Sequence, residues 1–185
     1  VKVTTYDGRA YLNAVKNTYD VIMVDAYQDI TIPFQMSSKE FFTLVKEHLK
    51  PDGVMVVNMN MRGGGEGNIN QYLSDTISTV FPEVFTVDVS NSSNRVLFAS
   101  DNAKMTQVFD NNLARVTDTS LYSAMYGVKT NYEKYSPTGK YILTDDKAPV
   151  ELLGMKVVDR MISDELSYYK EIFKKEGLKG LLSSF

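Results

Sequence analysis

The sequence predicts an α/β fold, because strand and helix patterns alternate along its first hundred residues. Two short apolar runs, at residues 20–25 and 54–58, have the composition of strands that are buried on both faces of a sheet. Between them, Ser37 and Ser38 can cap a helix through Leu49 whose apolar residues fall on one face. This order of elements is typical of a sheet that is mostly parallel.

Shorter patterns predict the other elements. A β-branched run over residues 1–6 predicts a first strand, and the apolar spacing that follows it predicts a helix over 8–17. Pro51 and Gly53 mark a turn at residues 50–53. Beyond that turn we expect a glycine-rich loop at residues 60–68, a helix at 69–80 and two strands in an antiparallel hairpin at 84–89 and 95–100. A helical region at 103–128, a polar connection at 129–148 and C-terminal helices at 150–183 should follow.

The composition excludes several kinds of site. With 20 Lys and Arg against 23 Asp and Glu, the net charge is −3, and the sequence lacks the dense basic face that binds nucleic acid. The absence of Cys excludes a disulfide framework and a cysteine nucleophile, and a single His48 excludes a histidine-rich metal site. No apolar run reaches the roughly 18–20 residues of a membrane span. We therefore expect a cytoplasmic domain without a bound metal.

The alternation of strand and helix patterns ends near residue 100, and mostly helical patterns follow. A length of 185 residues is enough for one sizeable core with an appended segment. We therefore expect residues 1–100 to form the α/β domain and residues 101–185 to form a helical C-terminal extension that packs on it.

Polar residues stand where three of the predicted strands end. Ligands bind outside the carboxyl ends of the strands in an open parallel sheet, which selects Asp7, Asp25 and Asn58 with their neighbours. A carboxylate at this edge can accept a hydrogen bond from a ligand or remove a proton from an attacking amine. Asp7 has an equally good alternative role as the cap of the helix that follows it.

Several ordered segments carry a resemblance to a known family. The runs DGRAYL, YDVIMVDAYQ and IPFQMSSKEFFTLVKEHLKPDGVMVVN resemble the second half of the spermidine synthases. The run LTDDKAPVELL at residues 143–153 is similar to a segment of the longer members of that group. The resemblance implies a Rossmann-like, class I methyltransferase-type sheet and an aminopropyltransferase activity.

The resemblance also implies roles for particular residues. Asp7 would bind the adenine amino group of a nucleosyl donor, and Gly8 would allow the donor to approach closely. Asp25 would act as the catalytic base on the attacking amine. Tyr27, Gln28 and Asp29 would bind the substrate, although the family has an acid at the position of Gln28, and a neutral amide cannot compensate an ammonium group. The neighbouring Asp29 could take its place.

The implied reaction transfers an aminopropyl group from decarboxylated S-adenosylmethionine to an amine, with no tightly bound cofactor. Two alternatives stay open at this point. Gln28 favours a methyltransferase-like protein that uses S-adenosylmethionine, and the missing donor motif favours a catalytically silent structural or binding fragment.

The resemblance implies that the chain is the C-terminal part of a longer enzyme. In the family, a glycine-rich turn and an acid that holds the ribose precede the position of Val1. The glycines at residues 63–67 lack the strand–GxGxxG–helix context of such a turn. We therefore expect a sheet without its first two strands, no turnover by the chain alone, and membrane contact only through a region before Val1. The exposed sheet edge predicts a homodimer formed through that edge.

Overall fold

The computed structural model describes residues 1–27, 33–59, 65–89, 92 and 94–183. Helices and strands alternate in the first part of the chain, as the sequence predicts, and further helices follow. The helices are α1 (Gly8–Ala14), η1 (Phe34–Met36, a single 3-10 turn), α2 (Lys39–Glu47), α3 (Ile69–Ser78), α4 (Met105–Leu113), α5 (Thr119–Asn131) and α6 (Val150–Ser183). The strands are β1 (Tyr19–Val24), β2 (Leu49–Met59), β3 (Glu83–Asp88), β4 (Arg95–Ser100) and β5 (Glu133–Lys134).

The described strands form one sheet in the order β1-β2-β4-β3-β5. β1 and β2 are parallel, with Val24 opposite Val57. β4 runs antiparallel to both β2 and β3, and β5 is antiparallel to β3. The α/β class and the antiparallel hairpin are therefore confirmed. The sheet is mixed rather than mostly parallel, because the hairpin inserts its second strand between β2 and β3.

The first six residues do not form the predicted strand. Residues 1–6 lie outside the sheet, so β1 is its edge strand. A cavity of about 380 Å³ lies between this segment, α1 and β1, and Tyr6 and Tyr11 contribute to its lining. β1 is consequently not buried on both faces: Val21 and Met23 keep 51% and 72% of their surface exposed. Pairing of this edge with a second copy remains a prediction.

The turn predicted at residues 50–53 interrupts β2 as a bulge. β1 and β2 are in regular register from Val21 and Val54 onward, and residues 50–53 bulge out before that stretch. A Cβ atom on Gly53 would lie only 3.0 Å from the carbonyl oxygen of Lys50. Glycine is therefore the residue that lets the chain turn tightly here and then re-enter the ladder.

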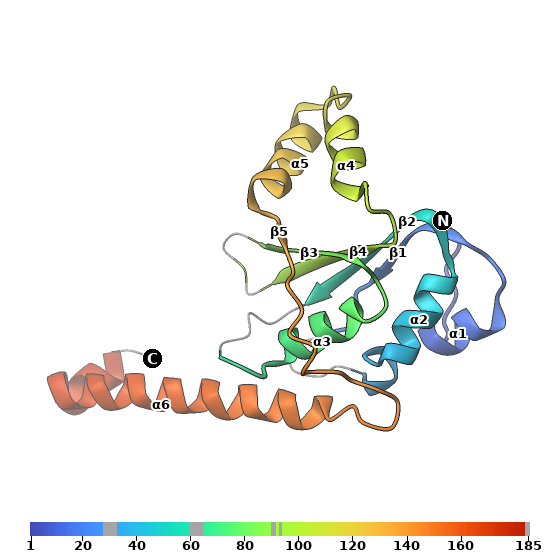
Figure 1. Ribbon diagram of the computed structural model, residues 1–185. Helices are drawn as coiled ribbons and strands as arrows, with labels where there is room; N and C mark the ends of the chain where they lie inside the picture. Colours follow the sequence, from blue (N-terminus) through green and yellow to red (C-terminus); the bar gives the residue numbers. More distant parts are fainter. Residues whose placement is uncertain (28–32, 60–64, 90–91, 93, 184–185) are drawn as a thin grey trace.

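Helices cover both faces of the sheet (Figure 1). α1, α2 and α3 lie on one face, whereas α4 and α5 lie on the other. The core is densest between the sheet and the pair α2 and α3. Fully buried side chains from both layers meet there, among them Phe42 of α2, Leu73 and Ile77 of α3, Met55 of β2 and Leu97 of β4. This packing fixes β1 and β2, the strands at whose ends the predicted site residues lie.

The region after residue 100 is mostly helical, as predicted, and also supplies a strand. β5 adds to the sheet beside β3, within the segment expected to be only a polar connection. α6 continues to Ser183 with a break at Gly177, whose φ of 64° lies in the left-handed region. No helix in the described part of the chain is long and apolar enough to cross a membrane. The boundary between two units at residue 100 remains a prediction.

A buried carboxylate fastens residues 135–141 to α3. Asp75 is 1% exposed. It accepts hydrogen bonds from the hydroxyl of Tyr135 (2.8 Å), from the amide N and the hydroxyl of Thr138 (2.9 and 2.5 Å) and from the amide N of Tyr141 (3.2 Å). Burial raises the pKa of Asp75, but the hydrogen bonds from Thr138 and Tyr135 outweigh it and hold the pKa below its ordinary value. We call residues 135–141 the strap.

Candidate active site

Asp25 stands directly after β1, at the carboxyl end of the parallel strand pair. The register pairs Val24 with Val57, which brings Asp25 beside Asn58 of β2. Asn58 Nδ2 donates a hydrogen bond of 3.0 Å to Asp25 Oδ1. The carboxylate is otherwise exposed. It is therefore oriented by one neighbour and remains accessible to a ligand from solvent.

Asn58 carries an unused acceptor at the same place. Its Oδ1 atom is buried and has no hydrogen-bond partner among the described residues. A buried amide oxygen without a donor is costly, so such an atom in a native structure calls for a partner. The amide thus orients Asp25 with its nitrogen and offers its oxygen to an N–H or O–H group.

Asp7 caps the first helix. Its Oδ1 accepts a hydrogen bond of 2.8 Å from the amide N of Ala10, and its backbone is extended as a cap requires. The capping role that the sequence allowed is therefore confirmed. Gly8 begins α1, and a Cβ atom added to it would lie 3.4 Å from Cε of Met36. Recognition of a nucleoside by Asp7 and Gly8 remains a prediction.

Tyr27 lies in the core rather than at the surface. It is 2% exposed, and its hydroxyl donates a hydrogen bond of 2.8 Å to the carbonyl oxygen of Met36. Burial raises the pKa of Tyr27 above the ordinary range. A ring this deep forms part of the core, and the binding of a substrate by Tyr27 remains a prediction. Gln28 and Asp29 lie outside the described residues.

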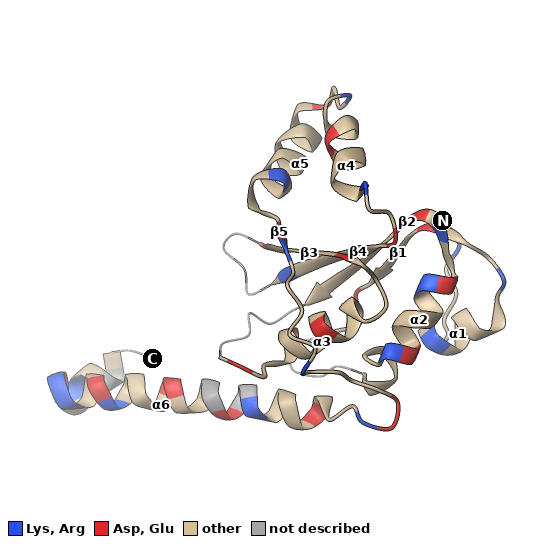
Figure 2. Ribbon diagram, in the orientation of Figure 1, with Lys and Arg blue, Asp and Glu red and all other residues tan. Residues whose placement is uncertain are grey.

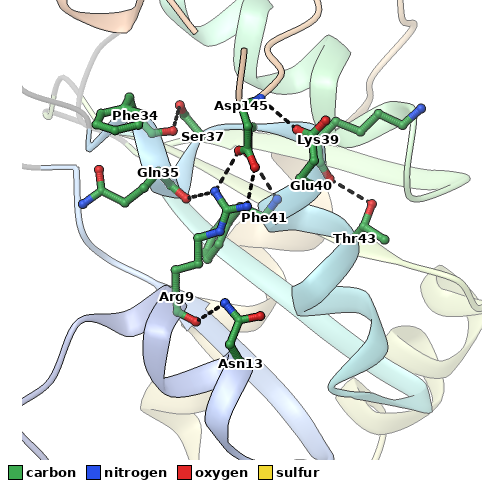
Figure 3. Close-up of polar contacts among 11 residues, drawn as sticks. Arg9, Asn13, Phe34, Gln35, Ser37, Lys39, Glu40, Phe41, Thr43 and Asp145 are labelled. Carbon is green, nitrogen blue, oxygen red and sulfur yellow. Dashed lines mark hydrogen bonds and ion pairs between the residues drawn. The ribbon is translucent and has the colours of Figure 1, made fainter. Parts of the chain in front are cut away.

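An ion pair joins two segments that are distant in the sequence, the start of α1 and the turn around Asp145 (Figure 3). Both terminal nitrogens of Arg9 donate to the carboxylate of Asp145, at 2.7 and 2.6 Å. Arg9 also donates a hydrogen bond of 3.0 Å to the carbonyl oxygen of Gln35 in η1. A bidentate pair of this kind fixes geometry as well as charge. The run that contains DGRAYL and the run LTDDKAPVELL therefore meet in space.

Asp145 gathers further contacts from the start of α2. The hydroxyl of Ser38, which also caps α2, donates a hydrogen bond of 2.5 Å to Asp145. The amide N of Asp145 donates to Glu40 at 3.0 Å. The hydrogen bond from Arg9 holds the pKa of Asp145 below its ordinary value, and the one from Ser38 acts in the same direction. The network ties α1, η1, α2 and the turn around Asp145 together.

Hydrogen bonds from Tyr27 and from Arg9 of this network position the two ends of the segment between Tyr27 and η1. The Tyr27 hydroxyl holds Met36, and Arg9 holds the adjacent carbonyl of Gln35. The two ends of the segment that carries Gln28 and Asp29 are thus joined to each other and to α1. Sequence reasoning missed this role of Arg9, because its partner lies 136 residues away in the chain. It also named Asn58 only as a strand-end residue and not as the partner of Asp25.

The described residues contain no group of three or more His, Asp or Glu side chains that could hold a metal ion. The polar groups of the candidate site are the Asp25 carboxylate and the Asn58 amide. Hydrogen bonds from Arg9 and Tyr27 hold the neighbouring η1 in place. Such a site can orient an amine and accept a proton from it.

Comparison with known proteins extends this picture. The family model described as the spermine/spermidine synthase domain matches residues 1–112. The chain belongs to this family. A relative named probable polyamine aminopropyl transferase, from Bifidobacterium longum, is 51% identical over 198 residues, which include 98% of this chain and 44% of the relative. The chain thus spans less than half the length of this curated relative of the spermine/spermidine synthase family.

Solved structures agree on the fold. A spermidine synthase in complex with the transition-state analogue AdoDATO has a TM-score of 0.53 and 21% identity, over 68% of this chain and 47% of that one. The spermidine synthase from Thermotoga maritima has a TM-score of 0.50 and 19% identity, over 68% and 46% of the two chains. At this level of identity the likeness supports the class I methyltransferase-type fold of the spermine/spermidine synthase family.

Proposed function

We propose that the protein containing this chain transfers an aminopropyl group from decarboxylated S-adenosylmethionine to an amine. Membership of the spermine/spermidine synthase family and the 51% identity to a probable polyamine aminopropyl transferase support this activity. The observation that carries it in the structure is Asp25, an exposed carboxylate at the end of a parallel strand, oriented by Asn58.

The chemistry needs a base and little else from this part of the site. The amine nitrogen attacks the carbon bonded to the sulfonium, and a C–N bond forms. The C–S bond breaks, and its electron pair neutralises the sulfur, which leaves as a thioether. The proton released by the amine passes to the carboxylate of the exposed residue Asp25, whose Oδ1 accepts a hydrogen bond from Asn58.

Donor and acceptor would meet on either side of this carboxylate. We propose that Asp7 and Gly8 bind the nucleoside of the donor. Capping uses one oxygen of Asp7, which leaves its second oxygen available to accept from an amino group. We propose that Gln28 and Asp29 bind the acceptor amine. Asp29 supplies the negative charge that an ammonium group requires and that Gln28 lacks.

An assay of aminopropyl transfer on the whole protein tests the proposal, with decarboxylated S-adenosylmethionine and a panel of diamines. The variant Asp25→Asn keeps the hydrogen-bonded geometry but cannot accept the proton. Its kcat should fall by about 100-fold to 10,000-fold with little change in KM. The matched control is Asp20→Asn, which changes an exposed acid of the same strand that pairs with Lys50. Full activity of Asp25→Asn would exclude Asp25 as the base.

The same assay separates the alternatives. Methyl transfer from S-adenosylmethionine, without aminopropyl transfer, would replace the proposal with a methyltransferase activity. A silent binding fragment predicts no turnover with either donor. Calorimetry with methylthioadenosine separates this case further, since low-micromolar binding would oppose a fragment without a nucleoside site.

A further inference from the structure

α6 presents a row of apolar side chains to solvent. Leu152, Met155, Ile162, Leu166 and Phe173 each keep between 51% and 61% of their surface exposed. In Figure 1 the helix runs past α3 and continues away from the sheet and its covering helices. Large exposed apolar side chains that are contiguous, rather than scattered, mark an interaction surface.

The spacing of these residues is that of a coiled coil. Beginning at Leu152, the positions 152, 155, 159, 162, 166, 169 and 173 follow one another at alternating steps of three and four residues. Tyr169 and Asp159 occupy the two positions not yet named. We call these seven residues the α6 stripe. At 1.5 Å per residue the stripe is roughly 33 Å long.

The body of the protein leaves the large apolar residues Leu152, Met155, Ile162, Leu166 and Phe173 of the stripe exposed. α6 attaches through the opposite side of its first turns, where Val150 is 1% and Leu153 is 7% exposed. In the heptad pattern Leu153 and the buried Gly154 lie away from the stripe positions Leu152 and Met155. Anchoring of α6 to the core and pairing of its stripe with another helix are therefore compatible.

The charges beside the stripe identify a suitable partner and its direction. Glu151 and Glu165 flank one side of the stripe, and Lys156 and Lys170 flank the other. Each Glu stands five residues before a Lys, which is the separation across a parallel two-stranded coiled coil. An antiparallel pair of copies would instead place Glu beside Glu and Lys beside Lys. Figure 2 shows that both signs of charge occur along the exposed helix.

We propose that α6 joins two copies of this chain through a parallel, two-fold symmetric coiled coil built on the α6 stripe. Each residue of the stripe then faces its own counterpart, as an isologous interface requires. The flanking acids pair with the partner's lysines in both directions across the two-fold axis. Asp159 meets the equivalent carboxylate of the second copy, which weakens the dimer, so Asp159→Asn should strengthen it.

Sedimentation velocity of the chain over a wide concentration range tests the dimer. We expect the mass to rise from 20.9 kDa to twice that value as the concentration increases. Leu166→Lys should abolish the rise, whereas Tyr168→Lys should not. Tyr168 is 60% exposed on the same helix but lies off the stripe. A monomer at all concentrations, or a dimer that survives Leu166→Lys, would overturn the proposal. Loss of the dimer in Met23→Lys alone would assign it to the edge of β1.

A single cysteine tests the direction of pairing. The chain contains no Cys, so the variant Leu166→Cys provides one reactive thiol. In the parallel dimer residue 166 faces its counterpart, and mild oxidation should yield a covalent dimer on a non-reducing gel. Glu165→Lys should weaken the dimer, and Glu165→Lys combined with Lys170→Glu should restore it. An antiparallel pair, which places Glu beside Glu, predicts that the single change does not weaken the dimer, and that result would refute the parallel arrangement.

Discussion

Asp75→Asn should destabilise the protein far more than the same change at an exposed carboxylate. The native carboxylate is buried and accepts four hydrogen bonds from the strap. An amide keeps one oxygen acceptor but turns an NH₂ group toward the donors on the other oxygen. The hydroxyl of Thr138 can rotate to accept, whereas the amide N–H of Tyr141 cannot. One hydrogen bond to a charged group is lost and one buried donor is unpaired, which costs about 2–4 kcal/mol.

Urea unfolding followed by circular dichroism measures this loss. The pKa of Asp75 is lowered in the folded protein, so its stabilising contribution is complete above the unfolded pKa and declines as the pH falls through the folded value. The difference between wild type and Asp75→Asn should therefore be constant from about pH 7 to about pH 5 and shrink below about pH 4. In that acidic range the native carboxyl gains a proton and loses the same advantage.

Asp118→Asn is the matched control for this experiment. Asp118 is an exposed acid whose side chain caps α5 by accepting a hydrogen bond from the amide N of Leu121. Asn serves as a cap almost as well, so the change should cost less than about 0.5 kcal/mol. If Asp75→Asn were equally mild, or if its cost did not depend on pH, the hydrogen-bonded carboxylate would not be what secures the strap.

Three further outcomes follow from the structure. Phe42→Ala removes a fully buried ring from α2 and should lower the free energy of unfolding by about 3–5 kcal/mol in the same urea assay. Arg9→Gln breaks the bidentate pair with Asp145, whose side chain is 42% exposed. It should cost about 1 kcal/mol, and less at high salt, as urea unfolding with and without added NaCl would show. Asn58→Ala should lower kcat of the whole protein by about 10-fold to 100-fold at similar KM, because Asp25 loses its positioning partner; an unchanged kcat would assign Asn58 a merely structural role.

Local patterns predicted most elements of the fold. Ser38 caps α2 as its position before an apolar stripe indicates, and the hairpin of β3 and β4 follows from two short runs with a polar linker. The apolar run of β1 was misleading, because Val21 and Met23 are exposed at a sheet edge. Burial of a strand depends on what lies beside it, and that information is not contained in the strand's own sequence.

The candidate site was predicted in part, for a similar reason. The position of Asp25 follows from the rule on strand ends, and the cap formed by Asp7 follows from its sequence context. The strand expected before Asp7 does not form, so the rule does not account for the position of Asp7. The pairing of Arg9 with Asp145 depends on how the chain folds back over α2. The sequence pattern predicts a loop position for Tyr27, yet its ring is buried in the core. The orientation of a side chain at a strand end is set by tertiary packing, which no local pattern records.

The hydrogen bond between the Tyr27 hydroxyl and the Met36 carbonyl separates the segment between these residues from the packed framework of sheet and helices. The hydrogen bond joins the residue before the segment that holds Gln28 and Asp29 to a residue of η1 after it, so both ends of that segment are fixed to the framework. We therefore expect replacements between these two fixed points to disturb the fold little, since connecting segments tolerate change far better than the framework beneath them.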